Sequence, residues 1–270
     1  MKVRYGILNE GENAWLFGDL AKNLSRVLEI EIVKSPSDIN YVLSWGNENW
    51  DKSRINSCRR MFIPHKSIKI ASDKRILTRL FKKNKIPSPR TYLCERYEVD
   101  SILEKQSKRV WCVKWPFGCG ASGHKIIKTS ADIKSSWPTP IILQEFISLE
   151  KPIVYRMYCA GRRLFGWNKR EFDEQTKQSP WVAHARGARY VALDHPNQKV
   201  LDLCEYTFRV TGLYESFGCI DLLQDRKGDW LVLETGTDGI FNYVDRDIGI
   251  SEIEKKIDLY IADAFRKKKF

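Results

Sequence analysis

The most informative stretch of this sequence is Ile220-Asp221-Leu222-Leu223-Gln224-Asp225-Arg226-Lys227-Gly228-Asp229-Trp230-Leu231-Val232-Leu233-Glu234. Apolar runs flank Lys227-Gly228, a natural tight turn, so the stretch predicts a β-hairpin. With that turn at its centre, Asp221 lies directly opposite Glu234, with Cβ atoms roughly 4.5–5.5 Å apart. Two carboxylates so close repel each other unless a cation separates them or one carries a proton. Oxygen ligands on adjacent strands suit Mg²⁺, although two acids facing water at frayed strand ends remain the alternative.

A glycine-rich stretch, Gly118-Cys119-Gly120-Ala121-Ser122-Gly123, matches the pattern G-x-G-x-x-G. A dinucleotide-binding loop opens a helix, whereas strand-like runs lie on both sides of this one, within 110–128. The next residues, His124-Lys125, do not match a P-loop, and the H-R-D and D-F-G motifs of protein kinases do not occur. We therefore expect a hairpin loop whose backbone N–H groups cover phosphates, with an ordinary flexible turn as the alternative.

Lys114 lies inside the apolar strand that precedes this loop. A charged group there needs a partner, and a phosphate would supply one. A lysine whose end reaches past the strand into water is the alternative. Lys114 is therefore a candidate phosphate ligand.

The composition is that of a folded globular protein. At 270 residues the chain has room for about two domains, and 43% hydrophobic with 30% charged residues excludes a disordered chain. A net charge of +12 favours anionic partners such as nucleotides, acidic metabolites or nucleic acid. We expect neither a signal peptide nor a membrane span, because charges interrupt every apolar run. Seven cysteines without a C-x-x-C pair favour a reducing, cytoplasmic environment.

Strand and helix signals alternate over residues 1–71, which predicts a small α/β unit. Ser72 or Asp73 can cap a helix that runs to Lys83, with Ile76, Leu77, Leu80 and Phe81 as its buried stripe. The remainder mixes helices and antiparallel strands, so we expect an α+β arrangement. Its expected elements are strands within 110–128, 141–147, 153–169 and 219–234, and helices over 200–211 and from 251 onwards.

Motifs for hydrolytic chemistry are missing from the sequence. Neither G-x-S-x-G nor H-E-x-x-H occurs. The four histidines, His65, His124, His184 and His195, are scattered along the chain. We expect each of them on the surface or in a loop.

The order of these pieces resembles the ATP-grasp superfamily, especially its RimK-like carboxylate–amine ligases. The order runs from Asp73-Lys74 through Lys114, the glycine-rich hairpin and Gln144-Glu145-Phe146-Ile147 to the Asp221–Glu234 hairpin. The resemblance covers most of the chain and implies an α/β N-terminal domain followed by an α+β ATP-grasp core, whose two antiparallel subdomains clamp the nucleotide. The implied divisions are 1–71, 72–148 and 149–270.

The resemblance implies an ATP site. Lys74 and Lys114 are similar to lysines that contact ATP phosphates, and Gly118, Gly120, Ala121, Ser122 and Gly123 resemble the mobile loop that covers them. Gln144, Glu145, Phe146 and Ile147 resemble the strand whose backbone reads adenine, and Glu150 is a candidate contact to the ribose hydroxyls.

The resemblance also implies catalytic and metal residues. Arg156 and Arg170 are similar to arginines that hold the γ-phosphate or the acyl phosphate, and Arg186 is similar to an arginine of a following loop. Asp221 and Glu234 match magnesium carboxylates. The family usually reads Glu-x-Asn at the second metal strand, but this chain has Glu234-Thr235-Gly236. Asp238 or Asn242 could replace the missing ligand, which leaves one or two metal ions open, and with them a non-catalytic relative.

The implied activity is ATP-dependent joining of a carboxylate to an amine through an acyl phosphate. The expected substrates are a small-molecule, amino-acid or peptide carboxylate and an amine, with Arg246 as a candidate carboxylate clamp. Relatives often form dimers or larger assemblies, so a homo-oligomer stays open. A small-molecule kinase of the same fold would share every nucleotide residue.

A second rival is a basic nucleic-acid-binding protein that stacks some of its nine tryptophans on bases. Its basic residues would form a stripe interleaved with aromatics. Here they spread along the whole chain, and Trp111 and Trp230 lie in strand patterns typical of a core. Nucleic acid is therefore the weaker alternative.

Overall fold

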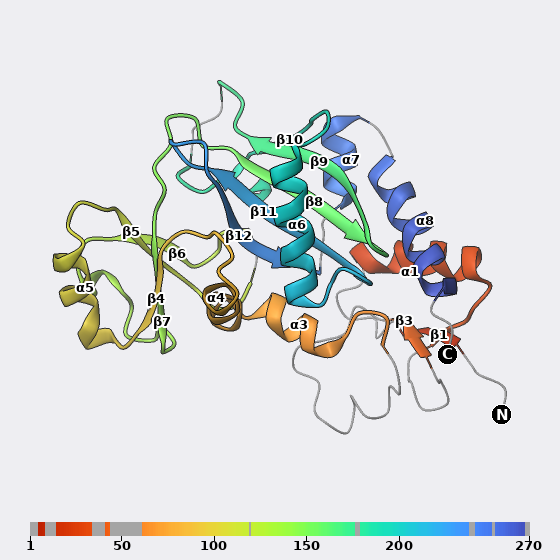
Figure 1. Ribbon diagram of the computed structural model, residues 1–270, viewed down its shortest axis with the longest axis horizontal. Coiled ribbons are helices and arrows are strands. Elements are labelled where there is room, and N and C mark those ends of the chain that lie inside the picture. The colour runs from red at the N-terminus through yellow and green to blue at the C-terminus, as the bar shows by residue number, and fades with distance from the viewer. Residues whose placement is uncertain are drawn as a thin grey trace.

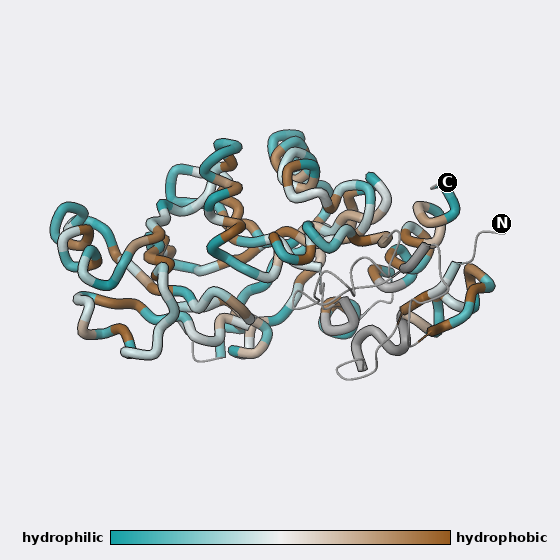
Figure 2. Tube along the Cα trace, turned by 90° about the horizontal axis from the view of Figure 1, so that it is seen from below, coloured by the Kyte–Doolittle hydropathy of each residue, from teal (hydrophilic) through white to brown (hydrophobic). Residues whose placement is uncertain are grey.

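The computed structural model describes residues 5–8, 15–33, 41–43, 61–118, 120–175, 179–237, 241–249 and 252–267. Three sheets organise these residues (Figure 1). The four-stranded sheet lies at one end of the long axis and the chain termini lie at the other (Figure 2). None of the helices in the described ranges is long and apolar enough to cross a membrane.

The N-terminal unit is a small parallel sheet in the order β2-β1-β3, as the strand and helix alternation predicts. Its elements are β1 (Tyr5–Leu8), α1 (Trp15–Leu28), β2 (Ile32–Val33) and β3 (Tyr41–Leu43). Two helices follow, α3 (His65–Ser72) and α4 (Lys74–Lys83). Sequence patterning did not predict α3.

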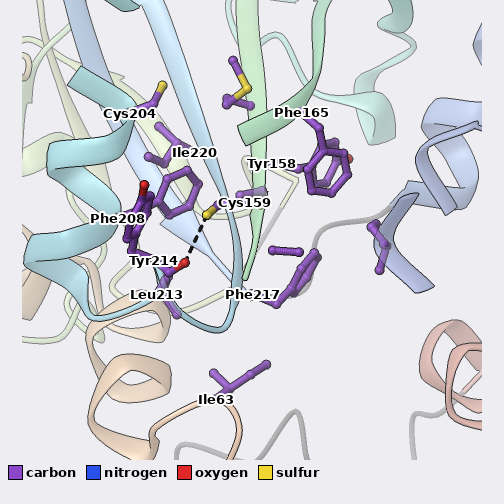
Figure 3. Packing of buried hydrophobic residues seen from close by; sticks show 14 of the residues in the cluster. Ile63, Tyr158, Cys159, Phe165, Cys204, Phe208, Leu213, Tyr214, Phe217 and Ile220 are labelled. Carbon is purple, nitrogen blue, oxygen red and sulfur yellow. Dashed lines mark hydrogen bonds between the residues drawn. The ribbon is translucent and has the colours of Figure 1, made fainter. Parts of the chain in front are cut away.

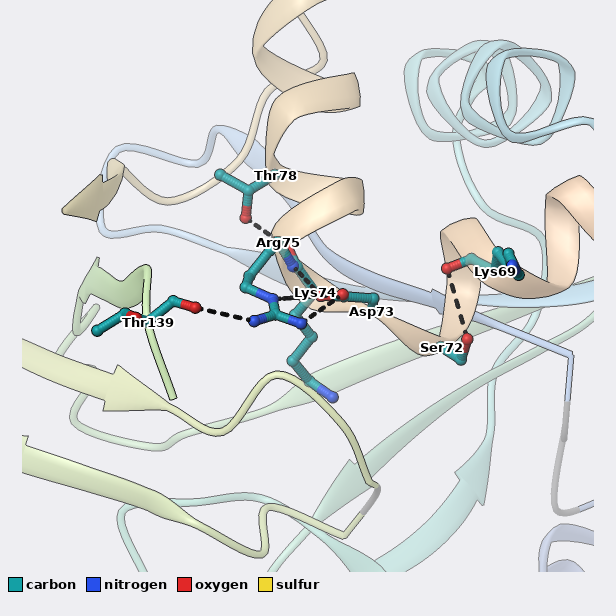
Figure 4. A network of polar contacts seen from close by, with 7 residues as sticks. All are labelled: Lys69, Ser72, Asp73, Lys74, Arg75, Thr78 and Thr139. Carbon is teal, nitrogen blue, oxygen red and sulfur yellow. Dashed lines mark hydrogen bonds and ion pairs between the residues drawn. The ribbon is translucent and has the colours of Figure 1, made fainter. Parts of the chain in front are cut away.

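Helix α4 begins where the sequence predicts. The Asp73 side chain accepts the Arg75 N–H at 2.8 Å, which caps the helix. Figure 4 shows this cap, with the Arg75 guanidinium held between Asp73 and the carbonyl of Thr139. The predicted buried stripe is partly wrong: Leu77 and Phe81 are buried, but Ile76 is 36% exposed. Ile76 lies on the face of α4 turned away from the core.

The second unit is an antiparallel sheet in the order β4-β7-β5-β6. It contains β4 (Thr91–Cys94), η1 (Arg96–Glu98), α5 (Val99–Lys105), β5 (Trp111–Lys114), β6 (His124–Ile127), η2 (Ser130–Asp132) and β7 (Ile141–Glu145). The glycine-rich stretch joins β5 to β6, which confirms the predicted strand–loop–strand arrangement.

The third unit is an antiparallel sheet in the order β10-β9-β8-β11-β12. It contains β8 (Val154–Ala160), β9 (Arg163–Glu171), η3 (His184–Arg186), β10 (Arg189–Ala192), α6 (Gln198–Thr211), β11 (Phe217–Gln224) and β12 (Trp230–Gly236). Helices α7 (Phe241–Ile248) and α8 (Glu252–Lys267) follow. Asn197 caps α6, and Gly212, in the left-handed region at φ 75°, ends it.

The β11–β12 hairpin confirms the predicted pairing of Asp221 with Glu234. The predicted Lys227-Gly228 turn is wrong by one residue. Gln224 pairs with Trp230, and the turn spans 225–229, with Gly228 in the left-handed region at φ 85°. A register shift between Asp221 and Leu222 compensates for this offset.

Two hydrophobic cores hold these units. The larger core joins the N-terminal unit, α3, α4, α6, α8 and the five-stranded sheet, and the smaller one fills the four-stranded unit. Figure 3 shows Phe208 of α6 packed near Ile220 and Cys159 of the sheet, with Tyr158 and Phe165 on its other side. The division at 71 and 148 stays a prediction, because a shared core does not exclude separate folding units.

Candidate functional site

A cavity lies among residues of the four-stranded and five-stranded sheets. Its empty volume is about 820 Å³, including the part open to solvent. Strands β5 and β7 contribute Lys114 and Gln144, and strands β9, β11 and β12 contribute Arg170, Asp221 and Glu234. Two sheets that belong to different hydrophobic cores thus meet at one site.

Strand register places the charged side chains on one face of the five-stranded sheet. Arg156 on β8, Asp221 on β11 and Glu234 on β12 are direct partners across adjacent strands. Arg170 on β9 pairs with Tyr190 on β10. Because directly opposed residues point to the same face, the sheet gathers these groups from strands distant in sequence.

Asp221 lies between two arginines. Its Oδ1 accepts Arg156 Nε at 2.7 Å, and its Oδ2 accepts Arg156 Nη2 at 3.1 Å and also Arg170 Nη2. All three residues are buried. Burial opposes a charge on Asp221, but the two guanidinium groups outweigh it and hold the pKa of its carboxyl below the ordinary value. Asp221 is therefore ionised at neutral pH.

Both arginines keep a buried donor without an acceptor among the described residues, Nη1 of Arg156 and Nε of Arg170. The Tyr190 ring lies 5.8 Å from the Arg156 guanidinium and 5.6 Å from that of Arg170. Burying a donor without an acceptor is costly, so an anion that reached these atoms would gain the hydrogen bonds that the protein does not supply. Of the two arginines, Arg170 lines the cavity and Arg156 does not.

The two predicted lysines lie near the same carboxylate. Lys74, the first residue of α4, donates to the Gly118 carbonyl at 2.8 Å, and its Nζ lies 3.7 Å from Glu234 Oε2. Lys114 lies on the inner side of β5, and burial lowers the pKa of its ammonium group. Because burial makes the charged form of Lys114 costly, an anionic ligand beside its ammonium group would stabilise that form.

The glycine-rich loop lies at the cavity, to which it contributes Gly120 and Ala121. A Cβ on Gly120 would meet the Cβ of Ala185 at 3.3 Å, so the loop approaches η3 closely. Gly123 has φ +72°, and a Cβ there would lie 2.7 Å from Trp115 Cβ. Glycine is required at Gly123 because neither the φ angle nor the space admits a side chain.

An aromatic wall, which sequence reasoning missed, closes another side of the cavity. The Trp181 ring lies 5.1 Å from both Phe146 and His124, edge to face. His124 lies on β6 rather than in a surface loop, which corrects the expectation for it. Burial and the nearby cations Lys114, Lys74 and Arg186 lower the pKa of His124 to about 2, so its ring is neutral. The strand-like run over 124–128 was the signal for His124, and nothing marked Trp181.

Some of the remaining predicted ATP contacts line the cavity, and others do not. Glu145, Phe146 and Ile147 line the cavity, and the Glu145 side chain pairs with Arg109. Gln144 also lines it and donates to Thr91 Oγ1 at 2.8 Å. Glu150 is exposed and does not line the cavity, and neither does Ser122.

Of the candidate substrate residues, Arg186 and Arg246 are exposed and do not line the cavity. Arg186 is exposed on η3 but close enough to affect His124. Arg246 on α7 is exposed and donates to His184 Nε2 at 3.1 Å, while His184 lies 3.4 Å from Asp247. Asp238 and the side chain of Asn242 lie outside the described part of the chain.

The donor set fits a magnesium ion that is held partly by a nucleotide. Among the described residues no group of three or more His, Cys, Asp and Glu forms a metal cage. Mg²⁺ usually takes one or two carboxylates and completes its shell with phosphate oxygens and water, so Asp221 and Glu234 suffice. Glu234, with its side chain 36% exposed, is the more accessible ligand, because Asp221 shares its oxygens with two arginines.

Comparisons with solved structures identify the fold as ATP-grasp. A D-alanine–D-alanine ligase from Bacillus anthracis complexed with ATP matches with a TM-score of 0.68 at 14% identity, over 98% of each chain. The ATP-grasp ligase PsnB, complexed with a minimal precursor, Mg and ADP, matches with a TM-score of 0.66 at 12% identity, over 98% of this chain and 99% of that one.

A RimK domain protein from Sphaerobacter thermophilus DSM 20745 matches with a TM-score of 0.65 at 14% identity, over 97% of this chain and 98% of that one. No family model and no curated protein matches the sequence. Fold and site thus define a chain with the ATP-grasp fold and a cationic, carboxylate-bearing cavity. At these identities the likeness establishes the fold.

Proposed function

We propose that this protein is an ATP-dependent carboxylate–amine ligase that forms an amide or peptide bond and releases ADP and phosphate. One observation above all supports the proposal. Lys114, Arg170, Asp221 and Glu234 converge on one cavity beneath a glycine-rich loop, although they come from two different sheets. The fold shared with ligases complexed with ATP, or with Mg and ADP, adds to that support.

The proposed chemistry follows from the weakness of a carboxylate as an electrophile, since it is charged and has no good leaving group. Transfer of the γ-phosphoryl group makes an acyl phosphate. An amine then attacks the carbonyl carbon, the new C–N bond replaces the C–O bond to phosphate, and the departing phosphate takes up the amine proton. Such transfer depends mainly on position and charge neutralisation.

The residues of this chain would supply both the positioning and the charge neutralisation. Lys74 and Lys114 hold the phosphates of ATP, and the buried donors on Arg156 and Arg170 hold the transferred phosphoryl group. Mg²⁺, where bound by Glu234 and Asp221, would neutralise further phosphate charge. Closure of the loop at Gly120 excludes water, which protects the acyl phosphate from hydrolysis.

The proposed substrates are an amino-acid or peptide carboxylate and an amine. PsnB was solved with a precursor peptide, and the net charge of +12 favours an acidic acceptor. Arg186 and Arg246, which are exposed, are candidate contacts to this acceptor.

The first test is thermal unfolding with ATP, with and without Mg²⁺, for the wild type, Glu234→Gln and Lys114→Met. ATP at a hundred times its Kd should stabilise the fold by about 2.7 kcal/mol. We expect Glu234→Gln to lose the part of this stabilisation that depends on Mg²⁺. We expect Lys114→Met to lose most of the stabilisation by ATP. An absence of any ATP effect on a well-folded wild type would contradict the nucleotide site.

The second test separates the ligase from a kinase of the same fold. Pools of amino acids and dipeptides are incubated with Mg-ATP and hydroxylamine, which traps an acyl phosphate as a hydroxamate. Free phosphate together with a hydroxamate supports the ligase. Phosphate retained on the acceptor, with no hydroxamate, supports the kinase.

A further inference from the structure

A groove between helices α3 and α4 combines an apolar floor with a basic rim. Its empty volume is about 1130 Å³, including the part open to solvent. Ile70, Ile76 and Leu80 line it, and Ile76 is the residue that sequence patterning wrongly placed in the core. Ile76 is thus an exposed aliphatic side chain beside the buried Ile70 and the half-buried Leu80.

The rim carries cations that form no ion pair with the acidic side chains the structure describes. Lys66, Lys69, Arg79 and Lys83 are exposed, line the groove and form no ion pair with a described residue. Several arginines elsewhere are paired, as in Arg75–Asp73, Arg162–Glu215 and Arg209–Glu205. From 64 to 85 the chain has eight lysines and arginines and a single acid. Like charges this dense repel one another unless an anionic partner lies between them.

The groove is separate from the nucleotide site. Helix α4 turns Lys74, Leu77 and Phe81 toward a small pocket shared with Lys114, and its other side toward the groove. In Figure 4 the Lys74 side chain extends away from Lys69, which belongs to α3. A ligand in the groove therefore leaves the ATP site free.

We propose that this groove binds an acidic amphipathic helix of a protein or peptide partner. Leucine-like side chains on one face of such a helix fit the aliphatic floor, while its carboxylates reach the rim lysines and Arg79. Among the described residues that line the groove, His65 has the one ring on which a base could stack. Phosphates do not use an aliphatic floor. Apolar floor and basic rim together therefore favour a peptide over a nucleic acid.

The test measures fluorescence anisotropy of a labelled peptide of about 18 residues, with leucines at helical i, i+3, i+4 and i+7 spacing and glutamates elsewhere. The full chain is used, and ATP is omitted. We expect saturable binding, which weakens about tenfold or more when serines replace the leucines. We expect single-stranded DNA of about 20 nucleotides to compete poorly.

Matched variants locate the binding. Lys69→Glu with Lys83→Glu reverses two rim charges, and Lys82→Glu with Lys255→Glu reverses two exposed lysines outside the groove. We expect the first pair to weaken binding about tenfold or more and the second to change it less than about twofold. Ile76→Ser, at an exposed position, should weaken it without unfolding the protein.

Equal binding of the serine peptide, equal loss in both double variants, or tighter binding of DNA would each overturn the proposal. Circular dichroism confirms that every variant is folded. Because no ATP is present, the outcome is independent of the ligase: peptide binding without any ATP effect contradicts the proposed function alone, and an ATP effect without peptide binding contradicts the groove alone.

Discussion

Asp221 is both the buried partner of two arginines and a candidate ligand for a metal ion. A buried carboxylate is costly unless it is paired, and here Arg156 and Arg170 both pair with it. The same pairing leaves Asp221 with fewer free lone pairs for a metal. Asp221 therefore holds the two arginines in position at least as much as it offers ligand oxygens, while Glu234 stays accessible.

We predict that Asp221→Asn destabilises the fold. The substitution leaves two buried guanidinium groups without a counter-charge, which should lower the free energy of unfolding by about 3 kcal/mol or more. Glu234→Gln, at the accessible end of a 3.7 Å ion pair with Lys74, should cost less than about 1 kcal/mol. Urea unfolding at pH 7 measures both, and equal losses would contradict a structural role for Asp221.

The difference in stability between the wild type and Asp221→Asn should change in a definite direction as the pH falls. Because the pKa of Asp221 is lower in the folded protein than in the unfolded chain, its ionised form stabilises the fold above the unfolded value of about 3.9. That stabilisation is lost as the pH falls through the folded value. The gap between wild type and Asp221→Asn should therefore close in strong acid.

We predict that His124 does not titrate between pH 8 and pH 5. Burial disfavours its charged form, and Lys114, Lys74 and Arg186 add to this, so its pKa is about 2. The imidazole Cε1–H resonance should stay at its neutral position over that range. A midpoint of about 6.5 for His124 would place it outside the cavity.

At the level of elements, the hairpin explains what patterning could and could not predict. Apolar runs and turn residues predicted the hairpin and the pairing of Asp221 with Glu234, and the structure has both. The turn position was missed, because Asp225 and Asp229 close a longer loop by hydrogen bonds that single-residue preferences do not encode. The compensating register shift depends on packing against neighbouring strands.

The residues of the site, like the hairpin, were predictable only in part. Charged residues inside apolar strands, such as Lys114, are visible in the sequence because they contradict their surroundings. Trp181 was not, since it lies in an irregular segment whose path is set by contacts to Phe146 and His124. The pairing of Arg156 and Arg170 with Asp221 requires the strand order β9-β8-β11, which no local pattern specifies.

We predict that Gly123→Ala distorts the glycine-rich loop. The new Cβ would lie 2.7 Å from Trp115 Cβ in a left-handed backbone conformation, which should cost about 1–3 kcal/mol and raise the Kd for ATP. Gly249→Ala is the matched control, since Gly249 has a similar φ of +76° but no atom within 4 Å of its Cβ. Equal losses of stability would attribute the effect to φ alone.

At the scale of the whole molecule, the two cores divide the protein unequally. The smaller core, with Val113, Ile141 and Leu143, serves the four-stranded unit only. The larger one joins every other unit. Because the ATP-site candidates come from both sides of this division, relative motion of the two units would open or close the cavity.

We predict that Leu143→Ala destabilises the four-stranded unit selectively. Leu143 is fully buried, so its truncation should cost about 2–5 kcal/mol. Amide hydrogen exchange should accelerate in β4, β5 and β7 while β8, β9 and β11 keep their protection. Phe208→Ala, in the larger core, should show the reverse pattern, and a uniform acceleration in both variants would mean that the molecule unfolds as one unit.

The larger core also ties the beginning of the chain to its last helix. Phe265 of α8 packs against Tyr5 and Phe62, and Arg266 donates to the Val27 carbonyl at 2.5 Å, across 239 positions of sequence. During synthesis on a ribosome, the first strand and helix must wait for these residues before their apolar faces are covered. The four-stranded unit, whose core is local, has no such delay. The order of synthesis and the order of folding therefore differ: the middle of this chain can mature while its start is still exposed to chaperones.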